Sequence, residues 1–146
     1  MKNISIGIAC DHAGFEYKEK LKIDLEQEGY KVKDYGTYSN ESADYPDFAH
    51  PVANAVEKKY HQYGITICGS GNGINMTANK YQGIRAALCW NKEIAELSRL
   101  HNDANICSLP ARFVDYKMAK EIVNIFLNTN FEGGRHLKRI GKIPIH

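Results

Sequence analysis

The stretch ITICGSGNGINMTANK (residues 65–80) carries the residue types best suited to chemistry in this 146-residue chain. An apolar run ends at Cys68, and Gly69, Gly71 and Gly73 follow before a helical pattern begins. A glycine-rich turn that opens a helix leaves several backbone N–H groups without partners, so it attracts negative charge such as a phosphate or an enediolate oxygen. A tight turn that needs positive φ is the purely structural alternative.

The glycine loop fits neither of the common nucleotide-binding motifs. No Lys-Ser or Lys-Thr pair follows it, so it is not a P-loop. It follows the third predicted strand, and the next strand ends at Cys89-Trp90-Asn91 without the acidic residue that binds ribose in dinucleotide folds. The sequence therefore disfavours a dinucleotide.

Cys68 stands between the strand and the loop. A helix N-terminus stabilises a thiolate, which could then act as a nucleophile or as a general base. A nucleophilic cysteine usually needs a histidine and a third orienting group, and the sequence around Cys68 supplies neither. A base beside an oxyanion-binding loop is the simpler interpretation.

Two histidines follow predicted elements at positions where they could contact a ligand. His12 comes just after the first predicted strand and should face the crevice, whereas its neighbour Asp11 could simply cap the next helix. His101 ends a predicted helix seven residues after Ile94, on the predicted inner face, so a core histidine is the alternative. A helix-end histidine suits a group that exchanges protons near neutral pH. Asn102 could be an ordinary turn residue.

The C-terminal segment concentrates basic residues. Arg135 and Arg139 are four apart and would project from one face of a helix, where their guanidinium groups suit phosphate oxygens. Arg112, after the last predicted strand, is a third candidate. A solvated basic tail is the alternative. Nucleic acid is disfavoured, because the net charge is only +2 and no aromatic residues interleave with the basic ones.

Apolar runs alternate with helical patterns along the whole chain. We predict strands over 4–10, 31–36, 64–68, 84–89 and 104–110, and helices over 14–28, 47–62, about 73–81, 91–101 and 115–128. This alternation predicts a single α/β domain over 1–146, with a parallel sheet covered on both faces. Ligands of such sheets collect at the carboxyl ends of the strands. Asp11, Cys68 and Arg112 lie at or just after such ends.

Composition sets the remaining expectations. No apolar run is long enough to span a membrane, and the N-terminus does not read as a signal peptide. The four cysteines show no metal-ligand spacing, so we expect reduced, buried thiols in a cytoplasmic protein. Residues 132–146 lie beyond a complete five-strand unit, and we expect them to form an extra helix that packs at a subunit interface.

Six motifs together are characteristic of one family. They are CDHAGF (10–15), DYPDFA (44–49), ICGSGNGI (67–74), NKYQGIRAALC (79–89), SRLHNDAN (98–105) and EGGRHLKRI (132–140). The chain thereby resembles the type B ribose-5-phosphate isomerases, among the RpiB/LacAB sugar-phosphate isomerases. The resemblance implies a Rossmann-like three-layer α/β/α sandwich, homodimers or homotetramers with active sites shared between subunits, and no metal or organic cofactor. It also implies conversion of an aldose phosphate into a ketose phosphate.

The resemblance also assigns roles to individual residues. Cys68 would be the base that moves a proton between C2 and C1, and Ser70 would hydrogen-bond the reacting oxygens. His101, helped by Asp11, would open the furanose ring. The anion hole would be formed by the backbone of Gly69, Ser70, Gly71, Asn72 and Gly73. The sugar would be contacted by Tyr45 and Asn102. The phosphate would be bound by His12, Arg112, Arg135 and Arg139, with His136 nearby.

The substrate within this class stays open. Ribose 5-phosphate is the first expectation, and a hexose 6-phosphate such as allose or galactose 6-phosphate is the alternative. A non-catalytic sugar-phosphate sensor on the same fold is a further alternative, although a sensor has no need of a thiol beside an anion hole.

Overall fold

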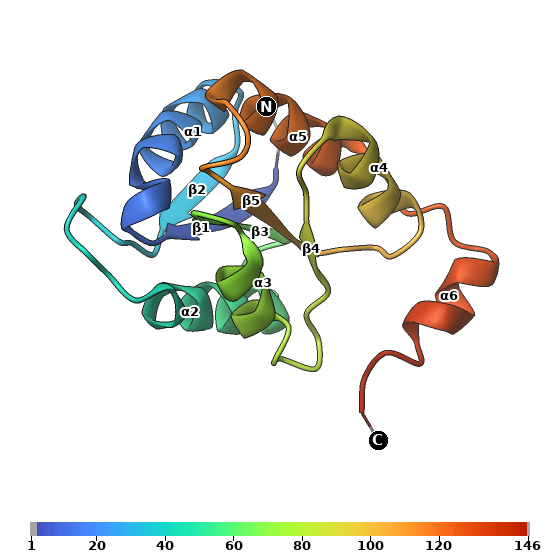
Figure 1. The fold of residues 1–146 in the computed structure, drawn as a ribbon. Helices are drawn as coiled ribbons and strands as arrows, with labels where there is room; N and C mark the ends of the chain where they lie inside the picture. The colour runs from blue at the N-terminus through green and yellow to red at the C-terminus, as the bar shows by residue number, and fades with distance from the viewer. Residues whose placement is uncertain (1–2, 146) are drawn as a thin grey trace.

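A five-stranded, all-parallel sheet lies at the centre of the computed structural model, which describes residues 3–145 (Figure 1). The strand order is β2-β1-β3-β5-β4. The strands are β1 Ser5–Cys10, β2 Lys31–Asp34, β3 Tyr63–Cys68, β4 Ala86–Leu88 and β5 Ile106–Pro110. Residues 1, 2 and 146 of the predicted single domain lie outside the described range.

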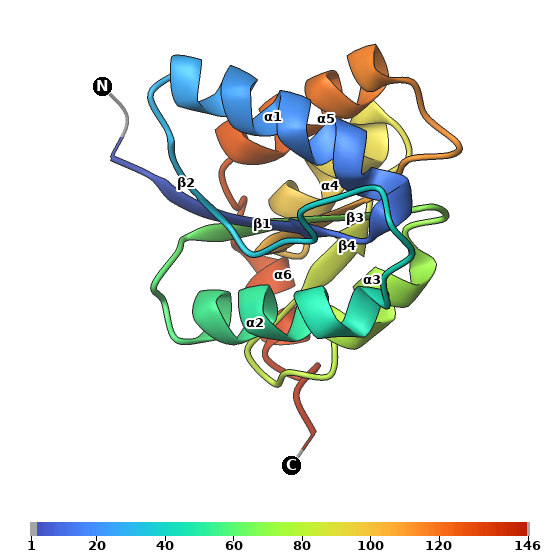
Figure 2. The same cartoon turned by 90° about the vertical axis from the view of Figure 1, so that its left-hand side faces the viewer.

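Helices cover both faces of this sheet. Figure 2 shows α1, α4 and α5 on one face and α2 and α3 on the other. The helices are α1 Phe15–Gln27, α2 Tyr45–Glu57, α3 Asn72–Ala78, α4 Lys92–Leu100, α5 Tyr116–Asn128 and α6 Arg135–Ile140, with a short 3₁₀ turn, η1 His12–Gly14, before α1. The predicted three-layer α/β/α sandwich is confirmed, and α6 is the predicted extra C-terminal helix.

The two faces of the sheet differ in the size of their side chains. Large apolar residues such as Ile6, Ile8 and Phe126 fill the core on the α1, α4 and α5 side. Small residues line the other side, where a Cβ on Gly7 would lie 2.8 Å from Val52 Cγ2. The missing side chain lets α2 approach the sheet closely, which brings the start of α2 near the carboxyl ends of the strands.

The edge strand β2 is held by charge as well as by its ladder. Lys18 of α1 is fully buried, and its Nζ lies 2.6 Å from the Asp34 carboxylate. Lys22 Nζ is 2.8 Å from the same carboxylate. Burial alone would raise the pKa of Asp34, but the hydrogen bonds from the two lysines outweigh it and lower the pKa. Within residues 3–145, no helix is both long enough and apolar enough to cross a bilayer.

Helix α2 differs most from its predicted range. It runs from Tyr45 to Glu57, whereas the sequence pattern predicted 47–62. The end is closed by Lys59, which adopts a left-handed conformation with φ 64°, and by Tyr60 N–H, which donates to Ala55 O at 2.9 Å. Such a turn usually carries glycine, so a lysine there gave no signal. The two edge strands, β2 and β4, are also shorter than the predicted 31–36 and 84–89.

Candidate active site

The first group of candidate residues gathers at the carboxyl ends of β1 and β3. These strands are neighbours, with Cys10 opposite Ile67, although β2 separates them along the chain. The winding direction therefore reverses between them, which is where open α/β sheets bind their ligands. Asp11 follows β1 and Cys68 ends β3, and Asp11 N–H donates to Ile67 O at 3.2 Å. The sequence correctly placed both at one edge.

The loop after β3 offers free backbone donors. Gly71 takes φ +75°, and its ideal Cβ would collide with Leu88, so the turn requires glycine here. Within residues 3–145, the N–H groups of Gly69, Ser70 and Gly71 donate to no protein acceptor, while Asn72 N–H donates to Ser70 Oγ at 3.2 Å. Three successive amides without acceptors among the described residues are donors that suit an anion.

Arg112 and Tyr45 flank this loop. Arg112 N–H donates to Gly69 O at 3.0 Å, and its guanidinium Nη1 lies 3.0 Å from where a Gly69 Cβ would be. The Tyr45 ring, at the start of α2, lies against Gly73 so closely that a Cβ there would overlap it. The structure thus brings together the glycine loop, Arg112, which the sequence placed at the ligand crevice, and Tyr45, which only the resemblance had named.

Asp11 caps the turn that follows β1. Its Oδ1 accepts from Ala13 N–H at 2.9 Å and from Gly14 N–H at 3.3 Å, so the capping interpretation is correct. Both capping bonds use one oxygen, which leaves Oδ2 for other partners.

His12 is oriented by the loop before α2. Its Nδ1 lies 3.1 Å from Ala43 N and 3.3 Å from Ala43 O. In the shorter contact Nδ1 accepts the amide proton, which assigns the ring proton to Nε2. That nitrogen is then a donor, the role that an anion requires.

Cys68 is nearly buried, with 4% of its surface exposed, beside Ala49 of α2 and Ile74 of α3. Its carbonyl accepts from Ala111 N–H at 2.9 Å, which fixes the strand end next to the loop. Burial raises the pKa of the Cys10 thiol, at the end of β1, to about 12. All four cysteines are free and buried, as predicted.

The second group of candidates lies at the opposite edge of the sheet. Helix α4 joins two parallel strands, so it must return the chain to their amino ends, and His101 and Asn102 follow it there. Cys68 pairs with Pro110 at the far end of β5, whose five residues span roughly 13 Å. Figure 1 shows α6, which carries Arg135 and Arg139, on this same distant side. One chain therefore does not bring His101 next to Cys68.

His101 is not a core residue. Its side chain is 38% exposed and stacks on the buried ring of His136, with the centroids 4.2 Å apart. The sequence predicted that Ile94, Leu97 and Ser98 form the inner face of α4. Ser98 is buried as predicted, but Leu97 is exposed, and Ala95 and Arg99 are buried in addition. Arg99 is satisfied by Asp103 and by the Ala104 carbonyl and packs against the Tyr63 ring. Arg135, Arg139 and Asn102 are exposed.

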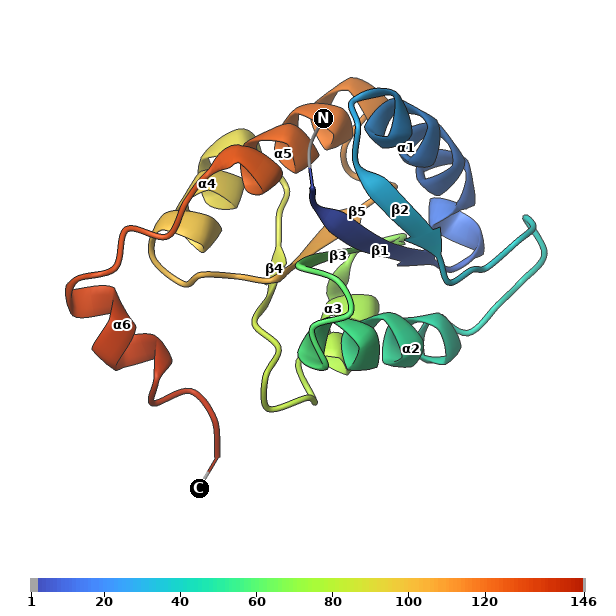
Figure 3. The same cartoon turned by 180° about the vertical axis from the view of Figure 1, so that it is seen from behind.

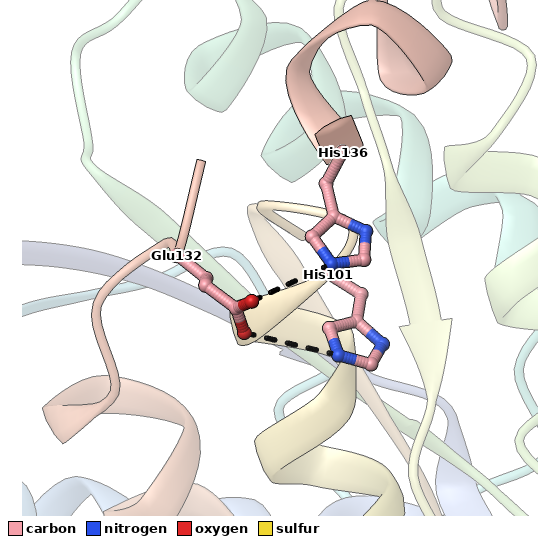
Figure 4. A group of neighbouring side chains, drawn as sticks. All are labelled: His101, Glu132 and His136. Atoms are coloured by element: carbon pink, nitrogen blue, oxygen red, sulfur yellow. Dashed lines mark ion pairs between the residues drawn. The ribbon is translucent and has the colours of Figure 1, made fainter. Parts of the chain in front are cut away.

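Glu132 joins this second group and was not a candidate from the sequence. Figure 4 shows its carboxylate facing both histidines. Oε2 lies 3.9 Å from His101 Nε2, and Oε1 lies 3.8 Å from His136 Nε2. Glu132 lies before α6 begins at Arg135, so its four-residue spacing from His136 is not a helical pair and gave no signal in the sequence.

Comparison with known proteins gives consistent results along the whole length. The model of a family described as Ribose/Galactose Isomerase matches residues 6–143. The chain is 45% identical over 143 residues to ribose-5-phosphate isomerase B of Escherichia coli K12, covering 98% of this chain and 95% of that protein.

Solved structures are equally similar. The crystal structure of a ribose 5-phosphate isomerase from Thermotoga maritima superposes with a TM-score of 0.96 at 49% identity, covering 98% of this chain and 99% of that one. The structure of ribose-5-phosphate isomerase B from Mycoplasma genitalium with bound ribulose-5-phosphate gives 0.93 at 43% identity, covering 98% and 95%.

Proposed function

Because this chain belongs to the ribose/galactose isomerase family, we propose that it interconverts ribose 5-phosphate and ribulose 5-phosphate. The observation that carries the proposal is a cysteine at the end of β3 followed by three amides without protein acceptors. A base beside an anion-binding surface is the pairing that an enediolate intermediate needs. The similarity to ribose-5-phosphate isomerase B of Escherichia coli supports the same substrate.

The central step is a proton transfer between two neighbouring carbons. The Cys68 thiolate takes the proton from C2, and the electron pair moves onto the carbonyl oxygen at C1, which becomes an enediolate oxygen. The amides of Gly69, Ser70 and Gly71 stabilise that oxygen, with Ser70 Oγ, Asn72 and Gly73 completing the loop. Loss of one such donor typically costs about 3 kcal/mol of transition-state stabilisation. A proton then moves from the hydroxyl oxygen at C2 to the oxygen at C1. As the carbonyl forms at C2, the Cys68 thiol returns its proton to C1, which gives the ketose.

Ring opening must come first, because the cyclic sugar has no carbonyl. His101 and Asp11 would exchange the protons of this step, and Tyr45 and Asn102 would contact the sugar hydroxyls. The phosphate would be held by the guanidinium groups and His12 Nε2, at a distance from the bonds that change, which fixes the sugar in position. This set of phosphate ligands is His12, Arg112, Arg135 and Arg139, with His136 nearby.

We propose that each active site draws on two copies of the chain. His101, Arg135 and Arg139 lie at the amino edge of the sheet and on α6, whereas Cys68, His12 and Arg112 lie at the carboxyl edge. A symmetric homodimer, alone or within a homotetramer, would place the α6 region of one copy against the glycine loop of the other. The exposed side chains of Leu137, Ile143 and Ile145 near α6 supply apolar surface for such contact.

The deciding experiment is turnover of ribose 5-phosphate by wild-type protein and by Cys68→Ala. The wild type should form ribulose 5-phosphate, and Cys68→Ala should lose nearly all of kcat while still binding the sugar phosphate, measured by calorimetry. Cys10→Ala is the matched control, because that buried thiol ends the neighbouring strand and should keep activity. A Cys68→Ala protein that retains more than about a tenth of kcat would exclude Cys68 as the base.

A hexose 6-phosphate is the second candidate, since the matching family model names galactose isomerases as well. Parallel assays with ribose 5-phosphate, allose 6-phosphate and galactose 6-phosphate separate the two, by the ratio of kcat/KM values. We further propose that the reaction needs no cofactor and takes place in the cytoplasm, where the four free thiols would stay reduced.

A further inference from the structure

His101, Glu132 and His136 converge from three separate segments of the chain. His101 follows α4, Glu132 lies in the connection after α5, and His136 is in α6. One ligand atom from each residue lies within 4.8 Å of the other two. In Figure 4 the two stacked imidazoles point their Nε2 atoms toward the same carboxylate.

The backbone around this cluster is fixed by hydrogen bonds. Glu132 N–H donates to Leu100 O at 3.1 Å, which ties the connection directly to the end of α4. Arg99 Nε donates to Thr129 O at 3.0 Å and holds the same connection three residues earlier. Gly133 and Gly134 then take φ +73° and +61°, which turns the chain back so that His136 reaches His101.

The His136 ring is buried, although its Nε2 lacks a hydrogen-bond partner among the described residues. The residue is only 6% exposed, and its Nε2 has no hydrogen-bond partner within residues 3–145. A buried nitrogen of this kind is unfavourable unless something binds it. Burial lowers the pKa of His136, and the neighbouring His101 and Arg135 lower it further. An unprotonated Nε2 at this position has a lone pair that can bind an ion.

We propose that His101, Glu132 and His136 bind a zinc ion. Two imidazole nitrogens and one carboxylate oxygen form a ligand set that Zn²⁺ takes at about 2.0–2.2 Å, with a fourth position open to water. Tetrahedral coordination needs ligand atoms roughly 3.3 Å apart. The exposed side chains of Glu132 and His101 can rotate to reach that spacing around the fixed His136.

The ion would inhibit the reaction and take no part in it. This consequence rests on the proposed function, in which His101 exchanges protons during ring opening. A zinc ion on His101 Nε2 occupies that nitrogen and holds the ring. The neighbouring cations Arg135 and Arg139 oppose a second positive charge, so we expect zinc to be bound reversibly and to be removed by chelators.

The first test measures binding without any enzymatic readout. Tag-free, metal-stripped protein is titrated with Zn²⁺ in competition with a chromophoric chelator, with its thiols kept reduced. We expect one ion per chain, and at least about tenfold weaker binding in Glu132→Gln and in His136→Asn. Glu132 is nearly half exposed, so the Glu132→Gln protein should fold normally, and circular dichroism checks both variants.

Two controls identify the ligands. His50→Asn removes an exposed histidine of α2 that contacts Tyr81 and lies outside the cluster. Cys68→Ala removes the one thiol of the four that keeps some exposed surface, 4%. Both variants should bind Zn²⁺ like the wild type. Unchanged affinity in Glu132→Gln and His136→Asn, or loss of binding in Cys68→Ala, would overturn the site.

The second test measures turnover of ribose 5-phosphate with and without Zn²⁺, each protein being normalised to its own metal-free rate. Zinc should inhibit the wild type, EDTA should restore the rate, and Glu132→Gln should need at least about tenfold more zinc for half inhibition. Full activity at saturating zinc would overturn the inhibitory role. A chain that does not turn over the sugar at all would refute the proposed function, and the binding test would still decide the site.

Discussion

At the scale of single residues, Gly71 does the most to shape the candidate site. It takes a left-handed conformation, and Leu88 and the Leu109–Pro110 backbone leave no room for a side chain. This one position therefore fixes the turn that leads from the glycine loop into α3. The sequence predicted the loop and its position, but it could not show which of the glycines needed positive φ.

We expect Gly71→Ala to destabilise the protein by about 1–2 kcal/mol, the usual cost of a left-handed conformation for a residue with a Cβ. We expect kcat to fall by more than the loss of folded protein can explain. The loop must shift to avoid Leu88, and its amides shift with it. Urea denaturation and kcat for ribose 5-phosphate measure the two effects.

Gly141→Ala is the matched control for this substitution. Gly141 has φ −64°, and its nearest neighbour to an added Cβ is 3.4 Å away, so we expect little change in stability. Equal losses in the two variants would show that Gly71 has no special conformational role.

At the scale of elements, the end of α2 is set by a residue with an unfavourable conformation. Lys59 adopts φ 64° where a glycine would meet no steric resistance. Lys59→Gly should therefore stabilise the protein by about 0.5–1 kcal/mol, measured by urea denaturation.

The preceding residue provides the comparison. Lys58 has φ −78°, close to the helical range. Lys58→Gly should instead destabilise the protein by about 0.5–1 kcal/mol, because glycine loses more conformational freedom on folding. If both glycines destabilise to the same extent, the helix end does not depend on the left-handed turn.

The elements also show what a sequence pattern can and cannot predict. The carboxyl ends of β1, β3 and β5 came out as predicted, because buried parallel strands are continuous apolar runs with abrupt polar ends. The inner face of α4 was predicted only in part: Ser98 is buried as expected. Arg99 is buried as well, and its guanidinium is satisfied by the carbonyls of Thr129 and Ala104 that the folded chain brings near. A pattern that counts apolar residues cannot detect a buried arginine.

At the scale of the whole molecule, the two groups of candidate residues lie at opposite edges of the sheet. The position of His101 follows from the order of the elements along the chain. A helix between parallel strands ends at their amino edge, and His101 follows such a helix. The contact between His101 and His136 could not be predicted, since it depends on the chain turning back at Gly133 and Gly134.

Sharing of sites between copies can be tested by complementation. Cys68→Ala and His101→Ala proteins should each be nearly inactive alone. In a mixed dimer, one of the two sites would receive both wild-type residues, so an equal mixture after subunit exchange should regain about a quarter of wild-type activity.

The control for the mixture replaces the His101→Ala chain with one that carries both substitutions. That mixture contains no Cys68 and should stay inactive. Absence of recovery in the test mixture, with mixed dimers seen by native mass spectrometry, would mean that each chain builds its site alone.

The position of α6, away from the carboxyl edge of its own sheet, has a consequence for how much protein must be present (Figure 3). Under the shared-site proposal a lone chain has no working site, because its own His101 lies at the opposite edge of the sheet from its Cys68. Specific activity should then decline on dilution, and the midpoint of that decline would report the dissociation constant of the assembly.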